Sequence, residues 1–255
     1  MTMNRRLVFL LVLFPAAASA QEGSIRFDRA VQYDFEVPEG WSEYEDLIPP
    51  ANVSAVLLLF NESASLMIPA PVEEEEKELT GMERRAQGMA QRLRMGSPSR
   101  SDQEVLLEAY VSYEDGMIAE TREFMGRTFL ISSTQPSYAW KLTGEQSEFL
   151  GFVVHKATAV HDSAVIEAWF APDIPVPAGP GSFGGLPGMI LAVSVDDGHT
   201  VYSATEVNLD GLEGGAIKPP EEGQAVTREE YEQIVAEKLA ELESMRRSRG
   251  RGDRQ

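Results

Sequence analysis

Alternation of apolar and polar residues recurs along most of this chain and predicts many short strands. It is clearest where Val31, Tyr33, Phe35 and Val37 are separated by single polar residues. A period of two places every second side chain on the same face of a strand, so one face can be buried. Segments of this kind are residues 24–37, 52–60, 65–68, 105–113, 117–124, 127–132, 138–142, 149–160, 164–170, 189–195 and 200–207.

Short turn sequences join these predicted strands. Asp115 and Gly116 form the strongest two-residue hairpin signal, and Asp196, Asp197 and Gly198 form another. No helical segment separates successive strands in the second half of the chain, which disfavours a parallel α/β sheet. We therefore predict a mainly β fold: a single curved antiparallel meander, shaped as a bowl or an open barrel.

Two segments have helical periodicity instead. Residues 73–95 begin with four glutamates, carry apolar residues at helical spacing, and are followed by Gly96 and Pro98. Their methionine-bearing stripe is typical of a flexible packing face, and a partner-binding face is the alternative. Residues 227–247 begin with a capping box of Thr227 and Glu230 and continue with a single apolar stripe.

The N-terminus has the three parts of a secretory signal peptide. Arg5 and Arg6 precede the apolar run 7–14, and Ala18, Ser19 and Ala20 fit the small-residue rule for cleavage. We expect cleavage after Ala20 and a periplasmic or secreted protein. The predicted organisation is a signal peptide at 1–20, a β domain at 21–226 with a helical insertion at 73–95, a C-terminal helix at 227–247, and a disordered basic tail at 248–255.

Composition narrows the possible functions. The net charge is −19, or −21 without Arg5 and Arg6, so nucleic acid is disfavoured as a partner. There is no cysteine, which excludes disulfides and thiolate zinc sites. The three histidines lack metal-ligand spacing, and no known catalytic motif occurs. We expect no cofactor, no metal, no membrane span and no enzymatic activity, and a monomer that binds a small ligand or an envelope partner not yet identified.

The segment 169–190 is unusual because it contains five prolines and five glycines together with large apolar residues. Proline and glycine at this density exclude a regular helix or strand. Its apolar residues favour burial, so we predict an ordered loop that folds across the sheet and covers part of the core. A fixed loop of this kind can also form the rim of a binding pocket.

The same region carries a family resemblance. Residues 185–190 read Gly-Leu-Pro-Gly-Met-Ile, and the motif loop comprises Gly185, Leu186, Pro187 and Gly188. Together with the segments 140–142, 151–158, 168–170, 172–176 and 179–183, this resembles the GLPGLI family over residues 104–207. The family consists of exported bacterial proteins without an assigned activity. The pattern is also similar to the bowl-like N-terminal domain of a secreted type of peptide-N-glycosidase, which implies a β bowl with an accessory or binding role.

Three functions stay open from the sequence. The first is a cell-envelope binding or accessory protein that holds a glycan, peptide or lipid on the concave face of the sheet. Its candidate ligand-binding residues are Trp140, Trp169, Asp173 and Phe183, although each aromatic residue also fits a purely core position. The second is a structural protein–protein interaction module. The third is an uncharacterised hydrolase.

Overall fold

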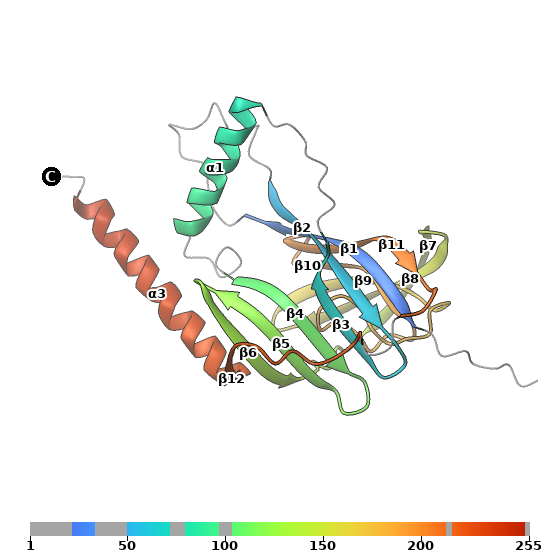
Figure 1. Ribbon diagram of the computed structural model, residues 1–255. Helices are drawn as coiled ribbons and strands as arrows, with labels where there is room; N and C mark the ends of the chain where they lie inside the picture. The colour runs from blue at the N-terminus through green and yellow to red at the C-terminus, as the bar shows by residue number, and fades with distance from the viewer. Residues whose placement is uncertain (1–21, 34–49, 72–79, 97–103, 213–215, 253–255) are drawn as a thin grey trace, which may run out of the picture.

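The computed structural model describes residues 22–33, 50–71, 80–96, 104–212 and 216–252 (Figure 1). The predicted signal peptide at 1–20 lies outside these residues, as does the 73–79 part of the predicted helical insertion. The elements in chain order are β1 (Gly23–Gln32), β2 (Ala51–Phe60), β3 (Ala64–Pro69), α1 (Gly81–Gly96), β4 (Glu104–Ser112), β5 (Met117–Phe124), β6 (Arg127–Thr134), β7 (Lys141–Phe149), β8 (Phe152–His161), β9 (Ala164–Ala171), β10 (Met189–Val195), β11 (Thr200–Asn208), β12 (Gln224–Thr227) and α3 (Arg228–Gly252).

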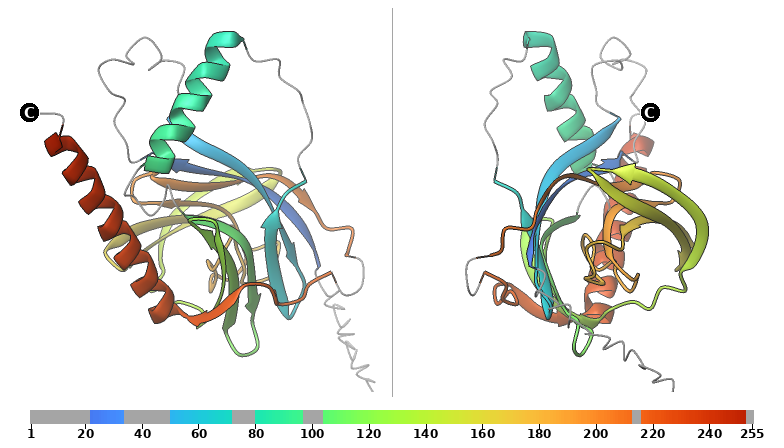
Figure 2. Two further views of the ribbon diagram at one scale, coloured as in Figure 1. Left: turned by 60° about the vertical axis from the view of Figure 1, so that its left-hand side comes forward. Right: turned by 90° about the vertical axis from the view of Figure 1, so that its right-hand side faces the viewer.

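A single twelve-stranded sheet contains all of these strands, in the order β12-β6-β5-β4-β3-β2-β1-β11-β10-β9-β8-β7. The sheet is antiparallel except where β12 pairs with β6 in parallel. It bends into an open bowl that does not close into a barrel (Figure 2). The predicted mainly β meander with two helices is therefore confirmed.

The hairpin turns form where the sequence predicts them. Asp196 and Asp197 adopt the left-handed conformation at the β10–β11 turn, and Gly116 does so at the β4–β5 turn. The backbone N–H of Met117 donates to the Asp115 carboxylate at 3.0 Å, which fixes the second turn. Asparagine, aspartate and glycine tolerate this conformation better than other residues, so these turns are specified locally.

Four element boundaries differ from the sequence prediction. The segment expected as one strand from residue 149 is instead the second arm of a hairpin, because Leu150 and Gly151 turn the chain between β7 and β8. The first strand ends at Gln32 instead of residue 37. The last helix continues to Gly252 instead of ending at residue 247, and residues 253–255 of the predicted tail lie outside the described residues. The four-residue strand β12 was not predicted.

Helix α1 also begins later than the sequence suggested. Its first residue is Gly81, and Thr80 caps it: Glu83 N–H donates to the Thr80 hydroxyl at 3.2 Å, and Thr80 N–H donates to the Glu83 carboxylate at 2.8 Å. This capping box defines the N-terminus of α1, and the glutamates at 73–76, where the sequence prediction placed it, lie outside the described residues.

The inner face of the bowl holds the main hydrophobic core. Ile25, Phe27, Leu58 and Met67 project from β1, β2 and β3 and are buried. The segment 172–188, called the plug below, runs over this face between β9 and β10 (Figure 2). Its side chains Ile174, Val176, Ala178 and Leu186 are buried against the sheet. The predicted ordered loop over the core is thus confirmed.

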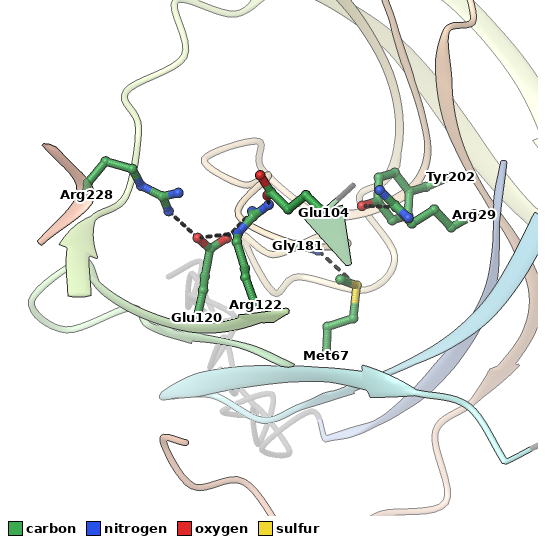
Figure 3. A network of polar contacts seen from close by, with 8 residues as sticks. All are labelled: Arg29, Met67, Glu104, Glu120, Arg122, Gly181, Tyr202 and Arg228. Carbon is green, nitrogen blue, oxygen red and sulfur yellow. Dashed lines mark hydrogen bonds and ion pairs between the residues drawn. The ribbon is translucent and has the colours of Figure 1, made fainter. Parts of the chain in front are cut away.

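Backbone hydrogen bonds fix the plug in place. Met189 N–H donates to the carbonyl of Ile174 at 2.9 Å, and Ile190 N–H donates to the carbonyl of Ala178 at 2.8 Å. Gly181 N–H points at the sulfur of the buried Met67, 3.2 Å away (Figure 3). These contacts satisfy polar groups that burial would otherwise leave without water, so the plug can be both irregular and buried.

A smaller hydrophobic cluster attaches the C-terminal helix. Tyr231 and Val235 of α3 pack on Phe124, Phe129 and Ile131 of β5 and β6, and all five are buried. The Tyr231 ring lies edge-on to Phe129, with 5.3 Å between the ring centroids. The predicted capping box also forms, with Glu230 N–H donating to the Thr227 hydroxyl at 3.1 Å.

Substitution of Gly188 tests the requirement for a close-packed plug. Gly188 has a φ of 154°, and a Cβ there would lie 2.3 Å from the Ala171 carbonyl oxygen. We expect Gly188→Ala to lower the free energy of unfolding by at least about 2 kcal/mol, since backbone cannot yield as a flexible side chain does. The measurement is chemical denaturation.

The matched control is Gly88→Ala in α1, where nothing lies within 4 Å of the new methyl group. That change should leave stability unaltered or raise it by up to about 1 kcal/mol, because alanine favours a helix over glycine. Equal stability of Gly188→Ala and the parent protein would contradict the close packing of the plug.

Candidate functional site

A cavity of about 860 Å³ lies on the inner face of the sheet. One wall comes from β5 and β6, with Glu120, Arg122 and Ser133. The opposite wall comes from Tyr138, from the β8–β9 turn with Asp162, and from Ser182 of the plug. The first turns of α3 contribute residues to a third side. The cavity therefore lies where the plug stops covering the inner face.

Charged side chains form a network at the base of this cavity (Figure 3). Arg122 donates to Glu120 through Nη2 at 3.0 Å and through Nε at 3.3 Å, and it also pairs with Glu104 of β4. Arg228, the first residue of α3, pairs with Glu120. The Glu120 carboxylate is only 2% exposed and bridges the two arginines. Two negative and two positive charges thus neutralise one another.

The electrostatics of the network follow from burial and pairing. Burial alone would raise the pKa of Glu120, but the charges of Arg122 and Arg228 outweigh it and lower the pKa below its usual value. Burial likewise disfavours the charged form of Arg122, yet Glu120 and Glu104 raise its pKa further above its ordinary value. Glu120 is therefore held ionised, which suits a positioning group better than a general acid.

An aromatic cluster lies on the other side of the cavity, centred on Tyr138. Its ring stacks with Phe183 at 5.6 Å between centroids, lies 5.2 Å from Trp140, and meets His161 edge-on at 5.2 Å. Burial raises the pKa of Tyr138, with a hydrogen bond to Ser182 opposing that shift. The phenol is thus neutral at pH 7 and offers both a donor and an acceptor at the cavity wall.

Two of the predicted ligand-binding residues belong to this cluster without lining the cavity. The indole N–H of Trp140 donates to the carbonyl of Gly184 at 2.9 Å, which ties the segment before β7 to the motif loop. Phe183 lies between Tyr138 and Tyr202, with 6.3 Å between its centroid and that of Tyr202. Both residues support Tyr138 from behind.

The other two predicted residues lie elsewhere. Ile166, Ala168 and Phe170 of β9 are buried in the core, whereas Trp169 alternates with them on the other face of the strand, where it is half-buried and still packs against the main hydrophobic cluster. There the ammonium of Lys156 lies 5.9 Å from the indole ring. Asp173 is exposed at the turn after β9. The concave face therefore receives neither residue, because strand alternation and the tight turn direct both outward.

The motif loop has a structural position in the plug. Leu186 is buried, while Gly185 and Pro187 are exposed. Gly184, just before the motif, accepts the Trp140 bond and has no room for a Cβ, which would lie 2.7 Å from the Pro177 carbonyl oxygen. The motif thus shapes the turn that returns the plug to β10.

The charged network of Glu104, Glu120, Arg122 and Arg228 was not predicted from the sequence. A signal for it existed in β5: Ile118 and Phe124 are core residues with the spacing of one strand face, and Glu120 and Arg122 occupy the two positions between them on that face. Charged residues at inward positions of a strand are rare unless paired. Their partners on β4 and α3 come from distant segments and cannot be read from the local pattern.

The described residues contain neither a metal-binding cluster of side chains nor a membrane-spanning helix. No group of three or more histidine and acidic side chains in the ranges given above is arranged to hold a metal ion. None of the helices in the described part of the chain is long and apolar enough to span a bilayer.

Substitution of Glu120 tests the network through its pH dependence. Because its pKa is lowered by folding, Glu120 stabilises the fold above its unfolded pKa, and this contribution is lost as pH falls through the folded pKa. We expect Glu120→Gln to cost about 3–5 kcal/mol at pH 7, the usual cost of breaking a buried ion pair. The difference from the parent protein should shrink below about pH 4 in urea denaturation.

The matched control is Glu243→Gln on α3, whose partner Arg247 is exposed. It should cost under about 1 kcal/mol at pH 7 because solvent screens such pairs. A Glu120→Gln cost that does not change between pH 7 and pH 3 would contradict the lowered pKa.

Comparison with known proteins locates the fold and the motif. Two crystal structures of PNGF-II, a peptide-N-glycosidase, are similar to this chain, with a TM-score of 0.51 in each case and sequence identities of 14% and 15%. The match covers 85% of this chain and 33% of the PNGF-II chain, so this protein spans about a third of its length. At such identity the likeness concerns the fold alone.

The sequence itself has one informative match. No curated protein matches the chain. Residues 155–192, from β8 through the plug to β10, match a family model described as "Protein of unknown function (Porph_ging)". This confirms the resemblance to the GLPGLI family, and it identifies residues 155–192, in a fold similar to part of PNGF-II, as the signature of a family of unknown function.

Proposed function

We propose that the protein is an exported binding or accessory protein that holds a polar ligand, a glycan or a peptide, in the cavity beside Tyr138. The observation that carries this proposal is the cavity itself. It opens on the inner face of a rigid sheet, where the plug covers the surrounding surface. Preformed concave sites with convergent polar groups are the usual place for a ligand.

The chemistry of the walls supports a polar ligand. Several residues that carry a hydroxyl group are among those that line the cavity, so donors and acceptors are available at its walls: Ser132, Ser133, Thr134, Tyr138 and Ser182. A lipid tail would bury these groups without partners, which costs free energy. The proposal thus favours glycans and peptides over lipids among the ligand classes considered from the sequence.

The charges lining the cavity disfavour an anionic ligand. Arg122 and Arg228 are already neutralised by Glu104 and Glu120. Three further acidic residues, Asp162, Glu229 and Glu232, line the cavity, and Asp162 Oδ2 lies 3.4 Å from His161 Nε2. The whole chain also has a net charge of −19. A neutral or cationic ligand therefore meets less repulsion than a phosphate or a carboxylate.

The proposal is binding without catalysis, and the ionised state of Glu120 is the reason. A carboxylate that two arginines keep ionised is a weak proton donor near neutral pH, so it fits recognition better than hydrolysis. PNGF-II is a peptide-N-glycosidase, but the similarity involves a third of its chain and does not transfer that activity. The proposed location is the periplasm or the medium, on the basis of the signal peptide predicted from the sequence at 1–20.

A structural interaction module is a second candidate, and one feature of α1 favours it. Ala86 and Ala90 are buried, while Met82 is 51% exposed. A methionine on an exposed helix face suits adaptable contacts with another protein. On this alternative, partner binding would depend on Met82 and not on the cavity.

A thermal-shift and calorimetry screen tests the main proposal. The mature protein is screened against glycans, peptides, lipids and divalent metals. We expect a glycan or peptide to stabilise the protein by about 2.7 kcal/mol at a concentration one hundred times its dissociation constant. Ser133→Trp fills the cavity and should weaken that binding by at least about tenfold, because the indole displaces ligand contacts.

The matched control is Ser147→Trp on the exposed edge strand β7, which should leave affinity unchanged. Equal loss of affinity in both variants would place the ligand elsewhere. If none of the four ligand classes stabilises the protein, the proposal is overturned and the interaction module becomes the favoured function.

A further inference from the structure

The third side of the cavity is formed by the C-terminal segment, which packs on the edge of the sheet, unlike the segments that form the other walls. Residues 224–252, called the strap below, comprise β12 and α3. They follow β11, in the middle of the sheet, but dock at its far edge beside β6. Arg228, Glu229 and Glu232 of the strap line the cavity, whereas its other walls belong to the sheet, the plug and the segment around Tyr138.

The strap is held by few contacts. Its strand β12 pairs with β6 over four residues, from Gln224 opposite Phe129 to Thr227 opposite Ser132, and three of its four side chains are exposed. Its helix buries Tyr231 and Val235, and Ile234 and Leu239 are partly buried against the same cluster. Beyond Leu239 the helix runs away from the sheet, as Figures 1 and 2 show. Short and partly exposed contacts of this kind open more readily than a core strand.

One polar contact joins the strap to the base of the cavity. Arg228 extends from the start of α3 to the buried Glu120 (Figure 3). If the strap leaves, Glu120 keeps its other partner, Arg122, so no isolated charge stays buried. This removes the large desolvation cost that usually prevents such a separation.

The residue directly before β12 lies very close to its neighbour strand. It is Gly223, which has a φ of 120°. At Gly223 a Cβ would lie 2.9 Å from backbone atoms of Phe129 and Leu130, so the chain approaches β6 closely at this residue. Docking of the strap thus depends on the close approach of Gly223 to β6, followed by the four-residue pairing of β12 with β6.

We propose that the strap is a movable wall of the cavity, latched by the Arg228–Glu120 ion pair, which swings out to admit the ligand. The proposal rests on the binding function given above. It assigns Arg228 as a positioning residue that closes the site by holding the strap. Release exposes the side chains of Phe129 and Ile131 together with the cavity base.

Thiol labelling tests the latch on the full chain without any ligand. The protein has no cysteine, so Ile131→Cys introduces a single thiol beneath the strap, at a position that is 0% exposed. When opening and closing are fast, the labelling rate follows the population of the open form. In this background Arg228→Ala should speed labelling by at least about tenfold, a factor that corresponds to ~1.4 kcal/mol, since the closed form alone loses the contact between the strap and Glu120.

Three controls make the result specific. Arg247→Ala removes an exposed pair with Glu243 at the far part of the same helix and should leave the labelling rate unchanged. Arg228→Lys keeps a charge near Glu120 and should restore part of the protection. Ala157→Cys places the thiol in the main core, where it should label slowly with or without Arg228→Ala.

Each remaining outcome contradicts the latch. An unchanged labelling rate in Arg228→Ala would show that the ion pair does not hold the strap. Equal acceleration at Ile131→Cys and Ala157→Cys would show that the whole domain unfolds, so the strap is no separate wall. Because labelling needs no ligand, failure of the ligand screen and failure of the latch are read independently.

Discussion

The fold depends on covering the inner face of a sheet that bends but does not close. Twelve strands arranged as a bowl present a large apolar surface, formed by residues such as Phe27, Leu58 and Phe170. A closed barrel would fill this space with its own side chains, and an open bowl needs another layer. The plug supplies this layer, because its prolines and glycines allow an irregular backbone whose polar groups bond to the chain itself.

The position of the cavity follows from where the plug stops covering the inner face of the sheet. The plug buries the half of the bowl around β1, β10 and β11, and the strap buries the rim at β5 and β6. Between them lies the cavity, with Ser182 of the plug on one side and Arg228 of the strap on another. Its polar character depends on pairing, since the buried Glu120 is neutralised by Arg122 and Arg228. Glu120 and Arg122 can therefore occupy inward positions that elsewhere in the sheet are apolar.

The family signature coincides with the plug and not with the cavity base. The matched residues 155–192 contain most of β8, all of β9 and the plug, and the start of β10, whereas Glu120 and Arg228 lie outside them. The motif residues Leu186 and Gly188 act in packing and close approach. The shared motif thus accounts for how the bowl is filled, whereas the proposed binding site includes residues of β5 and of the strap that lie outside the matched segment.

The sequence by itself determined the class of fold, the hairpin turns and the ordered plug. These are local properties: alternation specifies strands, Asp115 and Asp196 specify turns, and the prolines and apolar residues of 172–188 specify a buried irregular segment. Which faces meet depends instead on how distant segments pack. Trp169 alternates with the buried Ala168 and Phe170, but only packing determines which face of β9 meets the core, and Glu120 meets Arg228 across more than one hundred residues. A cavity formed between distant segments is a property of their packing, so its residues could not be identified before the segments were placed.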